Sequence, residues 1–160
     1  MRIGGRLKNY YQKRWSLMVD KIANRSSWKN MPLPDQRARL SVERTFPERE
    51  YNRLSRGLIP KRMEDKWFIY MEDDVLAFHR SWTGVCVYEV HFDNQKTIKD
   101  VLVNRKDEQY QGTDDEYDEQ LLMFLIDNLL LEQNRSFPMP SNLPGELPKG
   151  LYQHAIFGTG

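Results

Sequence analysis

Four closely spaced runs of aromatic and β-branched residues constrain the fold most strongly. The runs are Trp67–Met71, Val75–Arg80, Val85–Phe92 and Thr97–Asn104. Their composition is typical of β-strands. The gaps between them are only three or four residues long, which is too short for the helix that joins two parallel strands. The sequence therefore predicts a four-stranded antiparallel meander.

The apolar segment that follows these runs predicts a core helix. Thr113 is followed by three acidic residues, a pattern typical of a helix N-cap, and the helix should run to about Gln133. Its second half is apolar on most sides between Leu121 and Leu131, which is typical of a helix buried on more than one face. We therefore expect this helix to lie on the sheet and to be covered by another element.

Two further helices are predicted ahead of the strands. Residues 5–25 place apolar side chains on one face at helical spacing and basic side chains elsewhere. Thr45 as an N-cap and Gly57 after the last turn predict a short helix that ends near Ser55. Residues 26–44 contain a breaker cluster with two prolines, so we expect a loop there.

Together these elements predict an α+β fold in one domain, which suits a chain of 160 residues. The domain should span residues 1–135, with a basic helical part over 1–63 and the sheet and core helix over 64–135. Residues 136–160 are rich in Pro and Gly, and they predict an extended or poorly ordered C-terminal strap.

Charge is divided along the chain although the net charge is only +1. Residues 1–63 contain 16 Lys and Arg against 5 Asp and Glu, whereas residues 64–160 contain 8 against 18. The basic part can pack on the acidic part and compensate its charge. Nucleic-acid binding through the basic N-terminal part is therefore an alternative that is less favoured than the local charge suggests.

Composition also limits which cellular location and which cofactors can be expected. No run of 18 or more apolar residues is present, so no association with a membrane is expected. The single cysteine, Cys86, predicts a reducing, cytoplasmic setting without an internal disulfide. Cys86 and the three histidines are too widely spaced in sequence to match a zinc-ligand set, so no metal and no other cofactor is expected.

The segment Phe78–Gly84, at the turn between the second and third predicted strands, is the most unusual in the chain. It gathers an imidazole, a guanidinium, two hydroxyls and an indole, which are groups that hold phosphate and stack on a flat ring. We therefore expect an anionic ligand there, such as a nucleotide or an ADP-ribose-like molecule. The candidate ligand-binding residues are His79, Arg80, Ser81, Trp82, Thr83, Lys66, Arg49 and Arg53.

A simple register through this turn places His79 opposite Cys86 and on the same face of the sheet as Tyr88. Arg80 then lies on the other face, together with Glu89. A bulge of one residue would reverse this arrangement.

Catalysis would need a nucleophile and a base, and His79, Ser81 and Tyr88 are the candidates. His79 and Ser81 are two residues apart, so an extended strand would place both on one side, about 6–7 Å apart at Cα. No third group that would orient the base is evident. An enzyme, either a hydrolase or an ADP-ribosyl-transfer enzyme, is therefore an alternative and not the leading interpretation.

Three sequence segments carry a resemblance to a known family. The segments EDKWFIY, FHRSWTG and the acidic TDDEYD that follows them resemble an uncharacterised bacterial domain over roughly residues 45–131. Similar segments occur beside ADP-ribosylglycohydrolase-type domains, so the resemblance implies ADP-ribose or NAD metabolism, or conflict with phages and toxins. It carries over no catalytic residue, and the paired-Asp metal motifs of the hydrolase are absent from this sequence, which implies an accessory domain.

The leading hypothesis is thus a small cytoplasmic binding module for an anionic ligand. Besides the nucleic-acid and enzyme alternatives, a protein-interaction role stays open. In that role the protein would be an immunity or anti-defence factor whose acidic half docks on a basic partner.

Overall fold

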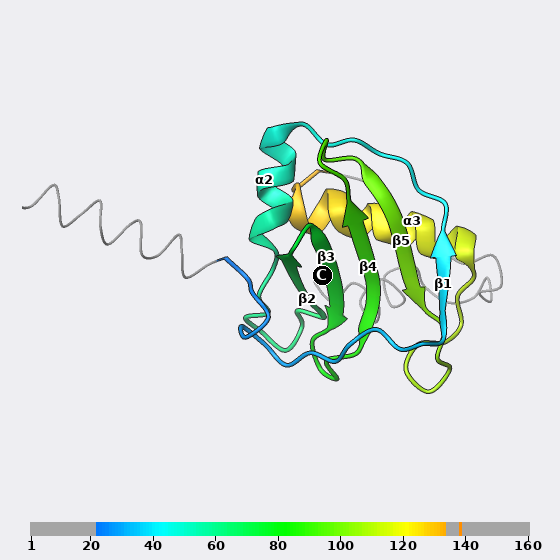
Figure 1. Ribbon diagram of the computed structural model, residues 1–160. Coiled ribbons are helices and arrows are strands. Elements are labelled where there is room, and N and C mark those ends of the chain that lie inside the picture. The colour runs from blue at the N-terminus through cyan, green and yellow to red at the C-terminus, as the bar shows by residue number, and fades with distance from the viewer. Residues whose placement is uncertain (1–21, 134–137, 139–160) are drawn as a thin grey trace, which may run out of the picture.

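The α+β class is confirmed, and the sheet has five strands where four were predicted. The computed structural model describes residues 22–133 and 138. The sheet is antiparallel throughout, with the order β1-β5-β4-β3-β2 (Figure 1). The strands are β1 (Arg37–Leu40), β2 (Trp67–Glu72), β3 (Val75–Arg80), β4 (Cys86–Phe92) and β5 (Ile98–Asn104).

The additional strand, β1, lies in the segment that was predicted to be a loop. It pairs antiparallel with β5, with Ala38 opposite Val103 and Leu40 opposite Val101. Only four residues long, β1 is too short to show an alternating pattern of its own. Pairing with β5 and the burial of Leu40 stabilise it, so a long-range contact decides its structure.

The predicted core helix is confirmed in position and burial. It forms α3 (Asp115–Leu125) and continues as a short π-helix, η1 (Ile126–Leu130). Figure 1 shows α3 running behind the sheet, across the strands. The N-cap is Asp114 and not Thr113, because the Asp114 side chain accepts a hydrogen bond from the backbone N–H of Tyr117. The buried residues of this segment are Tyr117, Asp118, Leu121, Leu122, Phe124, Leu125, Ile126, Asp127, Leu130 and Leu131.

The short helix is confirmed as α2 (Glu48–Arg56), with a corrected start. Its N-cap is Pro47, whereas Thr45 forms an isolated bridge with Thr97. Gly57 follows the last turn as predicted, and its N–H donates to the carbonyl of Leu54. Gly57 has a φ of 63°, and a Cβ there would lie 2.2 Å from the carbonyl oxygen of Ile69, so only glycine fits.

A β-bulge between β3 and β4 changes which residues share a face. His79 lies opposite Cys86 as predicted, but the register then shifts and Phe78 lies opposite Tyr88. Tyr88 therefore shares a face with Phe78, on the side covered by α3, and not with His79. The prediction that Arg80 shares a face with Glu89 is wrong for the same reason, since Glu89 lies opposite Ala77.

The second face of the sheet is partly covered by the segment that precedes β1. Ala23 packs there with Phe68, Tyr70 and Ala77 in a small apolar cluster. Residues 22–25 form a bend and turn, so the predicted N-terminal helix does not extend to residue 25.

Other sequence predictions are not tested by the fold. The rest of the predicted N-terminal helix and nearly all of the C-terminal strap lie outside the described residues. The domain limits at 1–135 and 136–160 therefore stay predictions. Within residues 22–133, no helix has the length and apolar character needed to cross a bilayer.

Candidate functional site

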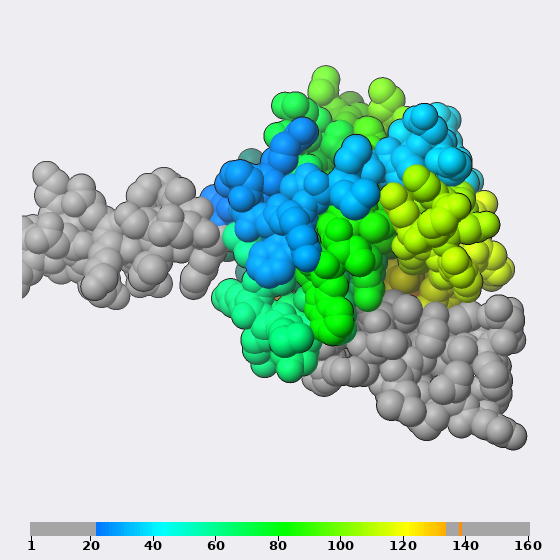
Figure 2. All heavy atoms as spheres, turned by 90° about the horizontal axis from the view of Figure 1, so that it is seen from below, coloured from blue at the N-terminus to red at the C-terminus, as the bar shows by residue number. Residues whose placement is uncertain are grey.

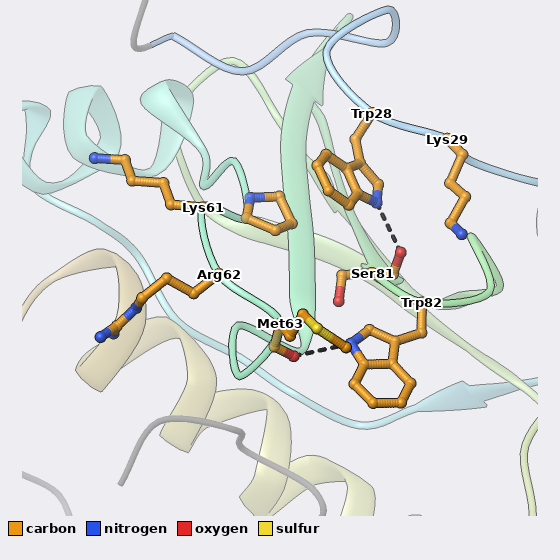
Figure 3. Close-up of a pocket in the computed structure, with 8 residues that line it drawn as sticks. Trp28, Lys29, Lys61, Arg62, Met63, Ser81 and Trp82 are labelled. Carbon is orange, nitrogen blue, oxygen red and sulfur yellow. Dashed lines mark hydrogen bonds between the residues drawn. The ribbon is translucent and has the colours of Figure 1, made fainter.

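Three loops at one end of the sheet enclose a groove of about 430 Å³. They are the segment before β1, the segment between α2 and β2, and the turn between β3 and β4. Figure 2, which views the molecule from this end, shows the blue, teal and green atoms of these segments side by side. The described residues that line the groove are Trp28, Lys29, Pro60, Lys61, Arg62, Met63, Ser81 and Trp82 (Figure 3).

Ser81, at the start of the β3–β4 turn, ties the three loops together. Its hydroxyl donates to the carbonyl of Asp65 at 2.6 Å, and its own carbonyl accepts the indole N–H of Trp28 at 2.7 Å. Ser81 is also almost fully buried. Ser81 therefore acts as a structural link at the base of the groove.

Gly84 lets the segment before β1 cross this turn closely. Its carbonyl accepts the N–H of Met31 at 2.8 Å, and a Cβ on Gly84 would lie 3.3 Å from the carbonyl oxygen of Lys29. The backbone of this segment thus occupies the space beside Gly84 that an anion would need. Gly84 serves chain packing here, not anion binding.

Asp65 organises the loop on the opposite side of the groove. One carboxylate oxygen accepts the backbone N–H groups of Lys61 and Arg62 at 3.0 and 3.2 Å. The carbonyl of Met63, in the same loop, accepts the indole N–H of Trp82 at 2.9 Å. This wall of the groove is therefore held by hydrogen bonds within its own loop and by one to the β3–β4 turn.

The groove is apolar at its centre and cationic around it. Figure 3 shows Trp28 and Trp82 with Ser81 between them, while the side chains of Lys61 and Arg62 extend away from both indoles. Lys66, although it does not line the groove, places its ammonium 3.8 Å from the ring centroid of Trp82. That contact is a cation–π interaction, and it brings a further positive charge to the groove.

Most of the exposed large apolar side chains of the described residues gather at this groove. Within residues 22–133, the exposed large apolar side chains are Ile22, Trp28, Met31, Met63 and Trp82. Three of the five line the groove, and Trp82 is 56% exposed. Clustering of exposed apolar groups is typical of a surface that binds something.

Of the predicted ligand-binding residues, Ser81, Trp82 and Lys66 lie at this groove. Thr83 belongs to the same turn and accepts a hydrogen bond from the N–H of Val85, but it does not line the groove. Arg49 and Arg53 lie on α2, away from the lining, and Arg53 donates to the carbonyl of Leu131.

His79 lies on the second face of the sheet and is 2% exposed. Its ring stacks on that of Tyr70, with centroids 5.5 Å apart. Burial lowers the pKa of His79 from 6.5 to about 4, although contacts with the backbone of Met31 and Phe68 oppose this. The imidazole is therefore neutral near pH 7 and does not line the groove.

Arg80 points to the opposite face, where its guanidinium lies 5.0 Å from the ring centroid of Trp67. Burial lowers the pKa of Arg80, and the neighbouring Tyr110 and Tyr88 oppose that shift. Arg80 does not line the groove.

Tyr88 is fully buried, and its hydroxyl donates to Asp118 at 2.7 Å. Burial, with Tyr110 and Asp118 close by, raises its pKa well above 10. The three catalytic candidates therefore occupy separate environments: His79 on one face of the sheet, Tyr88 under α3, and Ser81 in the turn. The structure does not bring them together as a nucleophile and its base.

Sequence reasoning missed six of the eight lining residues, namely Trp28, Lys29, Pro60, Lys61, Arg62 and Met63. One usable signal was a tryptophan within the loop-forming stretch 26–44, where an indole has no regular element to pack against. The other was the pair Lys61–Arg62 directly after Pro60, which predicts a cationic loop.

The chain matches no family model, no curated protein and no solved structure in the three comparisons made. The resemblance to the bacterial domain therefore stays a prediction.

Proposed function

We propose that this domain is a binding module for an anionic ligand with a flat ring, such as a nucleotide or an ADP-ribose-like molecule. The observation that supports this most is the pair of exposed indoles, Trp28 and Trp82, with Lys29 in the same lining and Lys66 against the ring of Trp82. Indole faces stack on planar rings, and ammonium and guanidinium groups bind phosphate. The groove volume of about 430 Å³ lies within the range of small-molecule sites.

Local charge supports an anionic ligand over a cationic one. Residues 22–133 contain 16 Lys and Arg against 21 Asp and Glu, so this part of the chain is acidic as a whole. Of the eight described residues that line the groove, three are nonetheless basic and none is acidic. A site for a quaternary ammonium ligand would not be lined by basic residues, because these cations would repel the positively charged ligand at such short distances.

A binding role is favoured over the enzyme alternative by the separation of His79, Ser81 and Tyr88. The nucleic-acid alternative depends largely on the basic residues 1–21, which lie outside the described residues. Exposed Trp, Met and Arg side chains are also common in protein interfaces. The experiment must therefore distinguish binding of a nucleotide from binding of a protein partner. The cytoplasmic setting inferred from Cys86 stays a prediction.

The proposal predicts that ADP, ADP-ribose or NAD raises the thermal midpoint of the full chain, because a ligand that binds only the folded state stabilises it. Replacing Lys29 and Lys66 together by alanine should weaken binding by about tenfold, since each lysine attracts phosphate. Thermal shift and titration calorimetry would measure both effects. A Lys99→Ala/Lys106→Ala variant is the matched control, because it loses the same charge in and after β5, outside the three loops that form the groove.

The proposal fails if none of the three ligands binds the wild-type chain, or if both double variants weaken binding equally. Equal weakening would indicate a general charge effect. Copurification of one stoichiometric protein, without any nucleotide effect, would favour the protein-interaction alternative.

A further inference from the structure

The polar groups that shape the groove are already engaged within the protein. The indole N–H groups of Trp28 and Trp82 both donate to backbone carbonyls, and the hydroxyl of Ser81 donates to Asp65. Each of these bonds ties one loop to another, so a ligand could use the donors only by loosening the groove. The indoles therefore offer a ligand their rings and not their N–H groups.

Backbone donors of the loop between α2 and β2 are engaged as well. The N–H groups of Lys61 and Arg62 both point to the carboxylate of Asp65. The N–H of Ser81 donates to the carbonyl of Lys66 at 2.9 Å. These groups are not available to read the edge of a nucleobase.

The lining side chains also offer few of the groups that distinguish one base from another. Asn, Gln, Asp and Glu read base edges through paired hydrogen bonds, and none of the described lining residues is of these types. Arginine and lysine can both read guanine, but the side chains of Lys61 and Arg62 extend away from both indoles in Figure 3. Among the described lining residues this leaves Lys29 as the one side chain that could contact a base edge. What the groove presents to a base is therefore mainly a flat apolar surface.

We infer that the groove reads a nucleotide through ring stacking and phosphate charge, without discriminating among the bases, and that Trp82 is the residue that requires a ring. This inference rests on the proposed function and names which parts of the ligand are recognised. Stacking tolerates any base because every base has a π-face. The ammonium of Lys66 packs against one face of the Trp82 ring. The indole is otherwise largely exposed, so a ligand can stack on it.

Titration calorimetry of the full chain with AMP, GMP, CMP and UMP, beside ribose 5-phosphate, tests this inference. The four dissociation constants should agree within about threefold, and ribose 5-phosphate should bind at least about tenfold more weakly because it cannot stack. Trp82→Ala should reduce nucleotide affinity to that of ribose 5-phosphate. Trp82→Phe keeps a ring and should retain most of the affinity, which separates loss of stacking from loss of folding.

The outcomes distinguish this inference from the function on which it rests. A preference of about thirtyfold or more for one base would overturn base-independent recognition and leave nucleotide binding standing. Equal affinity for ribose 5-phosphate would overturn the stacking role of Trp82 alone. If no nucleotide binds, and ADP-ribose and NAD do not bind either, the proposed function itself is wrong and the inference falls with it.

Discussion

Replacing Asp118 by alanine is expected to lower the free energy of unfolding by about 3–5 kcal/mol, the usual cost of removing one partner from a buried ion pair. Asp118 is fully buried. Its carboxylate accepts hydrogen bonds from Tyr88, Tyr110 and Thr113 at 2.7, 2.6 and 2.9 Å, and it lies 2.7 Å from the guanidinium of Arg105. The substitution would leave the hydroxyl of Tyr88 buried without its acceptor, which adds to the cost.

Asp115 provides the matched control for this prediction. It lies 2.6 Å from the same arginine, but its side chain is 60% exposed. Asp115→Ala should therefore cost less than about 1 kcal/mol, because water screens an exposed pair. Urea unfolding followed by tryptophan fluorescence would measure both variants. Equal losses in the two would show that the buried network contributes no more than a surface ion pair.

The same network illustrates what the sequence could predict about the fold. The strands β2 to β5 were predictable because each carries a run of aromatic and β-branched residues and the gaps between them exclude a crossover helix. Asp118, however, looks from sequence like one more acidic residue in the first turn of a helix. Its burial depends on Tyr88 and Tyr110, which reach it only after the sheet and helix have packed.

The candidate groove was predictable only where its residues are neighbours in sequence. Ser81 and Trp82 stood out because they share one turn, and Lys66 because it is a cation close by. Trp28 contacts Ser81 across 53 residues of chain, and no local pattern reports such a contact. The period of a strand separated two of the candidates already in the sequence: His79 and Arg80 are adjacent in β3, so their side chains point to opposite faces of the sheet.

A fall in pH from about 6.5 to 4 is expected to weaken the folded state by up to about 3 kcal/mol through His79 alone. The unfolded chain takes up a proton at this imidazole near pH 6.5, whereas the folded chain does so only near its lowered pKa of about 4. The contribution is therefore fully present above pH 6.5 and is lost progressively as the pH falls towards 4. Below pH 4 both states are protonated, and no further loss arises from His79.

The described side chains next to His79 carry no charge that would offset this effect. Glu89 shares this face of the sheet, but it lies opposite Ala77 and contacts His91. Tyr70 stacks on the ring and Cys86 lies directly opposite in β4. Burial raises the pKa of both groups, so neither carries a negative charge between pH 4 and 7. An imidazolium at this position would be buried without an ion pair to any described residue, which is the costly arrangement.

Urea unfolding of the wild type and of His79→Phe at several pH values between 4 and 7 would measure the effect. Because phenylalanine does not titrate, the stability of the wild type relative to His79→Phe should fall by about 3 kcal/mol as the pH is lowered across the window. His91→Gln is the control, since His91 is more exposed and lies beside Glu89. If His79→Phe does not fold, an NMR titration of the wild-type imidazole decides the matter, and a folded-state pKa near 6.5 would contradict the prediction.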